Sequence, residues 1–302
     1  MSTKILISDP IAEEGIDKLK EQGFELDIKV DLSPEELEEQ ISSYHGMVVR
    51  SATKVREPII DAAENLKIIV RAGVGLDNID VNYAENKGIK VQNTPEASSN
   101  SVAELAIGHM LSLARGIPRG TSSLKEGEWI KSELRGSELA GKKLGIIGIG
   151  RIGSLLAKKG EALGMEPRAY DKFIEEAPVE EVEMMDKKDV ISTADFLSLH
   201  IPFIKSEGPT ISTEELKSMK ESAYLINCAR GGVVDEKALK EALEKGWIAG
   251  AALDVYESER PGKNDLCGND NVSLTPHIGA STVEAQRRVG EGAAEKLIEF
   301  FS

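Results

Sequence analysis

The stretch that decides the fold is Lys143-Leu-Gly-Ile-Ile-Gly-Ile-Gly-Arg-Ile-Gly153. An apolar run leads into a Gly-x-Gly-x-x-Gly pattern, and a helical pattern leaves it over 151–163. Gly148 permits a tight turn, Gly150 removes a Cβ where a pyrophosphate must approach the backbone, and Gly153 lets the helix pack on the strand. Free N–H groups at the start of that helix favour phosphate. The stretch therefore predicts a strand, turn and helix that bind a dinucleotide.

An acidic residue follows this motif at the expected distance. Asp171 ends the next apolar run, 18 residues after Gly153. A carboxylate at this position would hydrogen-bond the ribose hydroxyls and repel a 2′-phosphate, which favours NAD over NADP. The alternative, a glycine-rich turn beside an ordinary surface aspartate, is weaker because strand, glycines, helix and acid all fall in register.

The rest of the chain alternates short apolar runs with amphipathic segments. In the first third we expect strands at 4–8, 24–30, 46–50 and 67–71, and helices at 11–22, from Ser33 and at 56–64. A polar stretch at 92–100 breaks the alternation, and a long helix follows at 99–115. Later strands are expected at 166–170, 196–200, 223–228 and 248–253, with helices at 235–245 and 281–300. This alternation predicts an α/β fold of two doubly wound parallel-sheet domains with a cleft between them.

Composition excludes several classes of function. The formal net charge is −15, which argues against nucleic acid and anionic membrane as partners. The two cysteines, Cys228 and Cys267, form no zinc spacing, so we expect no metal and a reducing, cytoplasmic setting. The N-terminus lacks the apolar run of a signal peptide, and no segment has the length of a membrane span.

Four further segments stand out: 71–80 (RAGVGLDNID), 227–232 (NCARGG), 253–259 (LDVYESE) and 275–282 (TPHIGAST). With EASSNSVAELAIGHM and GEWIKSELRGSELAGKKLGIIGIGRIG, in this order, the chain resembles the D-isomer-specific 2-hydroxyacid dehydrogenases over nearly its whole length. The resemblance implies a flavodoxin-like substrate-binding domain from 1–95 and 283–302, and a Rossmann NAD-binding domain from 96–282. It also implies a short form without a C-terminal regulatory domain, and a homodimer with 99–130 in its interface.

The resemblance implies a catalytic set of Arg230, Glu259 and His277. The chemistry suits these residue types, because transfer of a hydride to or from C2 requires a group that takes or gives the hydroxyl proton near neutral pH. Glu259 would fix one imidazole tautomer, and Arg230 would bind the carboxylate and polarise the C2 oxygen. On sequence alone, Glu257 competes with Glu259 in the same acidic loop, and the family pattern favours Glu259.

The remaining site residues are expected at strand ends and in loops. We expect Asp254 to orient the nicotinamide carboxamide, and Cys228 to be a small residue under the nicotinamide rather than a nucleophile. His45, His109 and His200 are expected to be ordinary interior or loop histidines, although His200 ends a strand near the expected cofactor edge. The expected cofactor-binding residues are Val74, Gly148, Gly150, Arg151, Ile152, Gly153, Asp171, His200, Ile201, Pro202, Cys228, Ala229, Arg230, Asp254, His277, Gly279 and Ala280. The expected substrate-binding residues are Arg50, Ser51, Arg71, Gly73, Val74, Gly75, Lys131, Arg230 and His277.

Two arginines suggest a phosphorylated substrate. Arg50 and Arg71 end neighbouring strands, so they would form an anion site, although Arg71 could equally form a structural ion pair with Asp77 or Glu104. Lys131 occupies the position where some relatives carry an arginine that reaches a neighbouring subunit's site. Two other departures from the family pattern are the loop 203–209 and Arg260, which replaces a proline.

There are three alternatives to an NAD-dependent dehydrogenase that acts on a phosphorylated 2-hydroxy acid. A glyoxylate or hydroxypyruvate reductase, or a D-lactate-type enzyme, would keep the same chemistry on an unphosphorylated acid. An NAD-sensing corepressor would use the same fold without turnover. A formate dehydrogenase is disfavoured, because that chemistry needs no carboxylate partner for the histidine.

Overall fold

The chain forms two compact units in this computed structural model, which describes residues 3–259, 261–263 and 265–302. Arg260, where the sequence departs from the family pattern, lies outside the described residues. The first unit is Met1–Ser99 with Ala280–Ser302, and the second is Asn100–Gly279. Among the helices in the described part of the chain, none is both long and apolar enough to cross a membrane.

The first unit is built on a parallel five-stranded sheet in the order β2-β1-β3-β4-β5. Its strands are β1 (Lys4–Ile7), β2 (Glu25–Ile28), β3 (Gly46–Val49), β4 (Ile68–Arg71) and β5 (Lys90–Asn93). This is the flavodoxin-like order, in which ligands bind beyond the carboxyl ends of the strands where the strand order reverses, between β1 and β3. The predicted doubly wound α/β architecture is confirmed for this unit.

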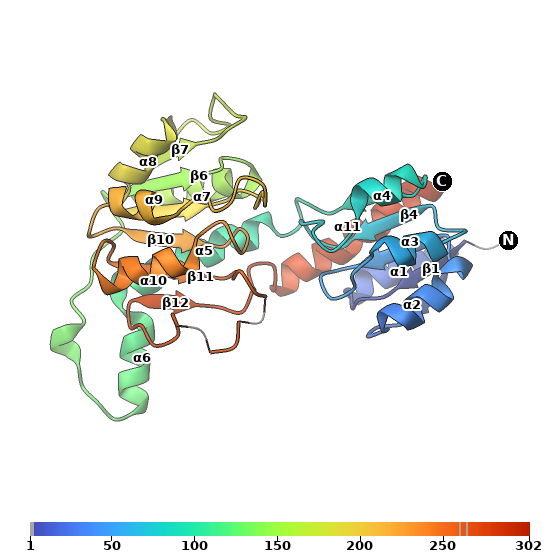
Figure 1. Cartoon of the computed structure of the whole chain (residues 1–302), viewed down its shortest axis with the longest axis horizontal. Coiled ribbons are helices and arrows are strands. Elements are labelled where there is room, and N and C mark those ends of the chain that lie inside the picture. The colour runs from blue at the N-terminus through green and yellow to red at the C-terminus, as the bar shows by residue number, and fades with distance from the viewer. Residues whose placement is uncertain (1–2, 260, 264) are drawn as a thin grey trace. The chain divides into compact units, whose positions relative to one another are not determined.

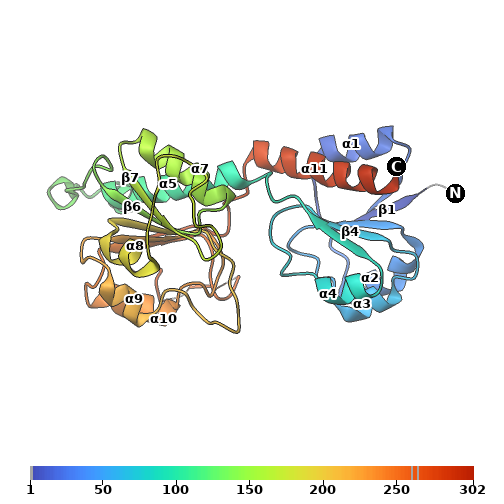
Figure 2. The same cartoon turned by 90° about the horizontal axis from the view of Figure 1, so that it is seen from above.

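Helices cover both faces of this sheet (Figure 2). One face carries α1 (Glu13–Glu21) and α11 (Val283–Phe301), and the other carries α2 (Pro34–Gln40), the turn Ile41–Ser43, α3 (Glu57–Ala62) and α4 (Val81–Asn86). The expected helix start at Ser33 is confirmed as a capping box with Glu36. The two helices α1 and α11 touch through glycines, since a Cβ on Gly15 would lie 2.5 Å from the carbonyl oxygen of Gly290.

The second unit is built on a parallel seven-stranded sheet in the order β12-β11-β10-β9-β6-β7-β8 (Figure 1). Its strands are β6 (Lys143–Ile147), β7 (Glu166–Tyr170), β8 (Glu183–Met184), β9 (Phe196–Leu199), β10 (Tyr224–Asn227), β11 (Gly250–Leu253) and β12 (Val272–Leu274). Counted from β6, this is the Rossmann order extended by one strand. The order reverses between β6 and β9, so the glycine-rich turn after β6 lies at the position where such folds bind dinucleotides.

Two helical layers enclose this sheet (Figure 2). On one face lie α5 (Ser99–Arg115) and α7 (Arg151–Ala162), and on the other lie α8 (Lys187–Thr193), α9 (Thr213–Ser218) and α10 (Glu236–Glu244). The helix α6 (Ile117–Lys125) and the turn Lys131–Glu133 follow α5. Leu144, Ile146 and Phe196 are almost completely buried in the core between the sheet and the layer of α5 and α7.

One expectation from the sequence is wrong. The alternation of strands and helices is expected to break at residue 92, where the polar stretch 92–100 begins. In the structure, Gln92 and Asn93 are instead the last two residues of the strand β5. This strand lies at the edge of its sheet and is only partly buried, so it needs no apolar run.

Candidate active site

The glycine-rich turn has the backbone geometry that its sequence predicts. Gly148 has φ of 97°, a region that residues with a Cβ rarely adopt. A Cβ on Gly153 would lie 2.1 Å from the carbonyl oxygen of Gly148, so only glycine lets α7 pack this closely. By contrast, a Cβ on Gly150 would meet no atom within 4 Å. The space at Gly150 and the N-terminus of α7 thus fit an approaching pyrophosphate.

The carboxylate of Asp171 is tied to the same turn. Its Oδ2 accepts a hydrogen bond from the backbone N–H of Ile149 at 3.0 Å, and its Oδ1 accepts from the N–H groups of Phe173 and Ile174. Each oxygen keeps further acceptor capacity for a hydroxyl group. Asp171 therefore supports the turn and is also placed to accept from a ribose.

His277 and Glu259 form a pair. The Nδ1 of His277 lies 3.0 Å from Oε1 of Glu259. Glu257, which sequence alone could not separate from Glu259, is engaged elsewhere: its Oε1 accepts from Glu236 N, and its own N–H donates to Glu236 Oε1. Because a carboxylate only accepts, the neutral imidazole in this contact carries its proton on Nδ1 and presents a lone pair on Nε2. His277 thus has the tautomer that a proton acceptor requires.

The backbone of His277 is unusual. Its φ is 55°, in the left-handed region that few residues other than glycine adopt. Asp254 fixes the residues after His277, because its carboxylate accepts from the N–H groups of Ile278 and Gly279, both at 2.8 Å. Tyr256 fixes the segment before His277, because its hydroxyl donates to the carbonyl of Thr275 at 3.0 Å. Such strained backbone persists only where the surroundings impose it.

Arg230 lies in a loop that packs tightly against the segment leading to Glu259. The backbone carbonyl of Arg230 accepts from the Asn227 side chain at 3.0 Å, and its guanidinium donates to the Ala229 carbonyl at 2.7 Å. A Cβ on Gly231 would lie 1.7 Å from the carbonyl oxygen of Tyr256. The glycine therefore allows the two loops that carry Arg230 and Glu259 to meet.

The other expected cofactor residues of this unit follow strand ends or the glycine turn. Arg151 and Pro202 are exposed, whereas Ile152 and Ile201 are partly buried. Burial lowers the pKa of His200 to about 4, so its ring is neutral, and Nε2 lies 2.9 Å from the Ser198 hydroxyl. Burial raises the pKa of the Cys228 thiol, which agrees with its expected role as a small residue and not a nucleophile. Ala229 and Gly279 are buried.

In the first unit, Arg50 follows β3 at the reversal of strand order. Its backbone N–H donates to Oδ2 of Asp9, the buried residue two positions beyond β1, and its guanidinium donates to the Pro10 carbonyl. Thr53 adds two hydrogen bonds to the same carboxylate. Burial lowers the pKa of Arg50, but a guanidinium remains charged. Asp9 is absent from the residues predicted from the sequence, although it is an acidic residue just beyond a predicted strand.

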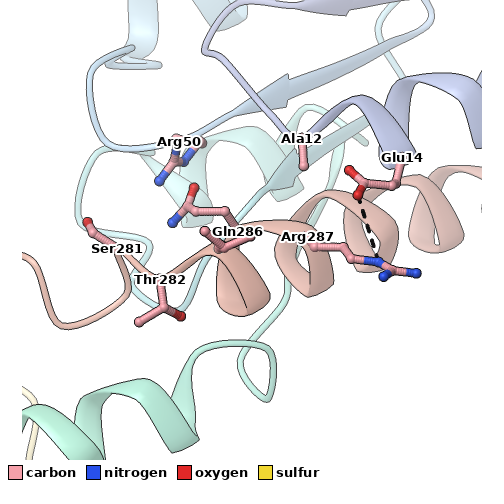
Figure 3. Close-up of a pocket in the computed structure, with 8 residues that line it drawn as sticks. Ala12, Glu14, Arg50, Ser281, Thr282, Gln286 and Arg287 are labelled. Atoms are coloured by element: carbon pink, nitrogen blue, oxygen red, sulfur yellow. Dashed lines mark ion pairs between the residues drawn. The ribbon is translucent and has the colours of Figure 1, made fainter.

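Arg50 lines a pocket of about 560 Å³ within this unit (Figure 3). Ser281, Thr282 and Gln286, at the start of α11, line it as well. Glu14 and Arg287, which form an ion pair with each other, line it too. Ala280 is partly buried just before this helix, and Ser51 is exposed after Arg50.

Arg71 lies against the turn formed by Gly73, Val74 and Gly75. A Cβ on Gly73 would lie 2.0 Å from a terminal guanidinium nitrogen of Arg71, and the φ of Gly73 is 147°. The carbonyl of Val74 accepts from the Asn93 side chain, while that of Gly73 accepts from Thr94 N. Arg71 therefore packs on its own turn, and both the anion site and the structural ion pair remain predictions. Lys131, the last expected substrate residue, is exposed in the turn Lys131–Glu133.

Comparison with known proteins places the chain in a family. The family model described as "D-isomer specific 2-hydroxyacid dehydrogenase, NAD binding domain" matches residues 107–279. The chain is 49% identical to a D-3-phosphoglycerate dehydrogenase of Methanocaldococcus jannaschii over 97% of its own length and 56% of that protein. It is 48% identical to a hydroxypyruvate reductase of Thermotoga maritima over 98% of its own length and 97% of that protein.

Solved structures support the same family assignment as the sequence comparisons. The structure of D-lactate dehydrogenase from Aquifex aeolicus, complexed with NAD and lactic acid, superimposes with a TM-score of 0.87 at 31% identity, covering 99% of this chain and 95% of that one. The chain belongs to the D-isomer-specific 2-hydroxyacid dehydrogenase family, and residues 107–279 are an NAD-binding domain. The chain spans 56% of the length of the D-3-phosphoglycerate dehydrogenases of Methanocaldococcus jannaschii and Archaeoglobus fulgidus.

Proposed function

We propose that this protein oxidises D-3-phosphoglycerate to 3-phosphohydroxypyruvate with NAD, the first step of L-serine biosynthesis. The observation that carries the proposal is the 3.0 Å contact between Glu259 and Nδ1 of His277, in the same unit as the glycine-rich turn. The choice of a phosphorylated substrate is supported by Arg50, which follows β3 where the strand order reverses and lines a pocket at the start of α11.

His277 would handle the proton of the reaction. In oxidation, Nε2 would take the hydroxyl proton from the C2 alcohol while the imidazole becomes positively charged, and Glu259 would stabilise that charge. NAD, when bound, accepts the hydride that leaves C2. Gly148, Gly150 and Asp171 would hold this cofactor. In reduction, the same imidazolium would return the proton to the C2 oxygen.

Arg230 and Arg50 would bind the two ends of the substrate. Arg230 would pair with the carboxylate and polarise the C2 oxygen, because a guanidinium offers two parallel donors to such a group. Arg50 would bind the phosphate, supported by its place where the strand order reverses and by the polar start of α11 in the same pocket. Under this proposal the first unit is the substrate-binding domain.

A second candidate keeps the chemistry but removes the phosphate. The 48% identity to a hydroxypyruvate reductase over 97% of that protein's length supports it. Hydroxypyruvate also carries a carboxylate and a C2 carbonyl, so Arg230 and His277 would act in the same way. The two candidates therefore differ in what Arg50 binds.

The test compares substrates and an arginine variant. NAD reduction is followed at 340 nm with D-3-phosphoglycerate, D-glycerate and D-lactate, and NADH oxidation with hydroxypyruvate. For a phosphate ligand, Arg50→Gln should raise KM for phosphoglycerate about 10- to 100-fold, the effect of losing a charge-assisted hydrogen bond, and leave KM for D-glycerate within about twofold. Arg56→Gln is the matched control, since Arg56 already pairs with Asp80 at 2.7 Å.

Each outcome has a meaning. Preference for phosphoglycerate with the expected effect at Arg50 supports the first candidate. Preference for hydroxypyruvate, with Arg50→Gln neutral, supports the second. No turnover of any of these acids would argue against both and favour an NAD-sensing protein. We further propose that the protein acts in the cytoplasm as a homodimer.

A further inference from the structure

A chain of side-chain hydrogen bonds runs beneath the loop that carries His277. Nδ1 of His109, on α5, lies 2.9 Å from the Ser273 hydroxyl, and its Nε2 lies 3.1 Å from the Thr275 hydroxyl. The Thr275 hydroxyl donates to Oδ1 of Asp254 at 2.6 Å. His109, Ser273 and Asp254 are 3%, 8% and 1% exposed, so water is largely excluded from the chain.

The chemistry of these groups fixes the direction of each bond. The Thr275 hydroxyl has one proton and gives it to the Asp254 carboxylate, so its oxygen must accept from Nε2 of His109. Burial lowers the pKa of His109, which keeps the ring neutral. A neutral ring with a proton on Nε2 has a lone pair on Nδ1, which accepts from Ser273. The proton arrangement therefore runs one way, from Ser273 to Asp254.

The series of hydrogen bonds ends at the two backbone amides that follow His277. Oδ1 of Asp254 accepts from both Thr275 and Ile278 N, while Oδ2 accepts from Gly279 N. A carboxylate that rotated would lose the geometry of both amide contacts. Thr275 is thus placed to hold the carboxylate in the plane that suits the loop, and the loop holds His277 at its left-handed φ of 55°.

We propose that His109, Thr275 and Asp254 form a positioning relay, which sets the orientation of the His277 imidazole through the backbone of residues 275–279. The proposal rests on the proposed function, in which His277 takes the substrate proton. Neither His109 nor Thr275 touches the reacting atoms in this scheme. Their effect on turnover would pass through the loop, so His109, which is an interior histidine as expected, would also have a positioning role.

Two substitutions of one residue test the relay. Thr275→Val keeps the shape of the side chain and removes the hydroxyl, while Thr275→Ser keeps the hydroxyl and removes a methyl group. Because a small displacement of a reacting group is costly, Thr275→Val should lower kcat at least ~10-fold, and Thr275→Ser should stay within about twofold of the wild type. The thermal midpoint of each variant is measured alongside, to separate turnover from unfolding.

The kinetic outcomes decide as follows. A large loss in the valine variant with recovery in the serine variant supports the relay. An unchanged kcat in Thr275→Val overturns it. Equal losses in both variants also overturn it, since the hydroxyl would then not be the cause.

A spectroscopic measurement keeps the proposal testable if a variant fails to fold or if the wild type turns over no 2-hydroxy acid. The chain has four histidines, so their imidazole nitrogens are separable by long-range 1H–15N NMR. Wild-type His109 should show the Nε2–H tautomer, and the amide protons of Ile278 and Gly279 should lie downfield. An Nδ1–H tautomer overturns the relay whatever the activity. The expected signature in a protein without turnover would contradict the proposed function alone.

Discussion

Two glycines of the same turn should respond to alanine in opposite ways. Gly150→Ala places a methyl group in open space, on a residue whose φ of −67° any amino acid adopts. Gly153→Ala places it 2.1 Å from the carbonyl oxygen of Gly148. The first substitution should therefore affect the ligand that approaches the turn, and the second should affect the fold.

The size of each effect follows from these distances. Real Cβ contacts stay beyond 3.0 Å, so α7 must move by about 0.9 Å to admit the methyl group at position 153, against backbone that cannot rotate away. Overpacking of this kind costs about 1–3 kcal/mol, which lowers the thermal midpoint of a domain of this size by roughly 2–12 °C. Gly150→Ala should cost under about 1 kcal/mol in stability, because alanine is only a poorer N-cap. It should weaken NADH binding about 10- to 100-fold, as displaced phosphate loses charge-assisted hydrogen bonds.

The assay pairs a thermal melt of the free protein with a fluorescence titration of NADH. Gly108→Ala is the control, because a Cβ there meets no atom within 4 Å and the position lies in α5, away from the turn. Wild-type NADH affinity in Gly150→Ala would refute the placement of the pyrophosphate at this glycine. Wild-type stability in Gly153→Ala would refute the close packing of α7 on the turn.

Three further predictions follow from other residues. His277→Ala should lower kcat at least ~10²-fold in the 340 nm assay with little change in NADH affinity, and equal losses of both would indicate a structural role. Asp171→Asn, which keeps one acceptor oxygen for the turn, should reduce the NAD over NADP preference in kcat/KM about tenfold, whereas an unchanged ratio would leave Asp171 only its structural bonds. Hydrogen bonds from Tyr44 and Lys4 lower the pKa of Asp27, so its stabilisation is present above the unfolded value near ~4 and is lost as pH falls through the folded value. Asp27→Asn should thus lower the free energy of unfolding in urea at pH 7 by about 1 kcal/mol, and the difference from the wild type should shrink progressively as the pH is lowered below ~4; a difference that stays constant over that range would contradict the role of the charge.

Most of the architecture follows from local patterns. The helix at 99–115 and the capping box at Ser33 lie where the sequence predicts them, because periodicity and caps act within a few residues. The sequence patterns predict no separate element at α4, α6, α8, α9, β5, β8 or β12. These are short, and contacts from the rest of the fold rather than local propensity define them.

The candidate site likewise contains residues that local sequence patterns predict and residues whose roles depend on contacts in the folded chain. The Gly148 turn can be predicted from the sequence because two of its glycines meet local steric demands, the positive φ at Gly148 and the close approach of Gly153 to the Gly148 carbonyl. The choice of Glu259 over Glu257 is not, because it depends on Glu236, which is distant in sequence and binds the competitor. The role of Asp9 is not predictable from the sequence for a related reason, since its contact with Arg50 exists only when β1 and β3 pair in the folded sheet.

Overall identity cannot decide the substrate, because two relatives with different names match this chain at 49% and 48%. Both reactions need a carboxylate ligand, a proton acceptor and a hydride carrier, so the residues that serve these needs carry no information on the choice. The two substrates differ at the end remote from C2, where one bears a phosphate and the other a hydroxyl. An anion there requires a cation, and Arg50 is a candidate: its guanidinium donates to the Pro10 carbonyl, and the Asp9 carboxylate, which accepts from Arg50 N and Thr53, interacts with the guanidinium through its charge alone. Because Arg50 is the residue that we propose as the phosphate ligand, the variant at Arg50, and not one at His277, would separate the two enzymes.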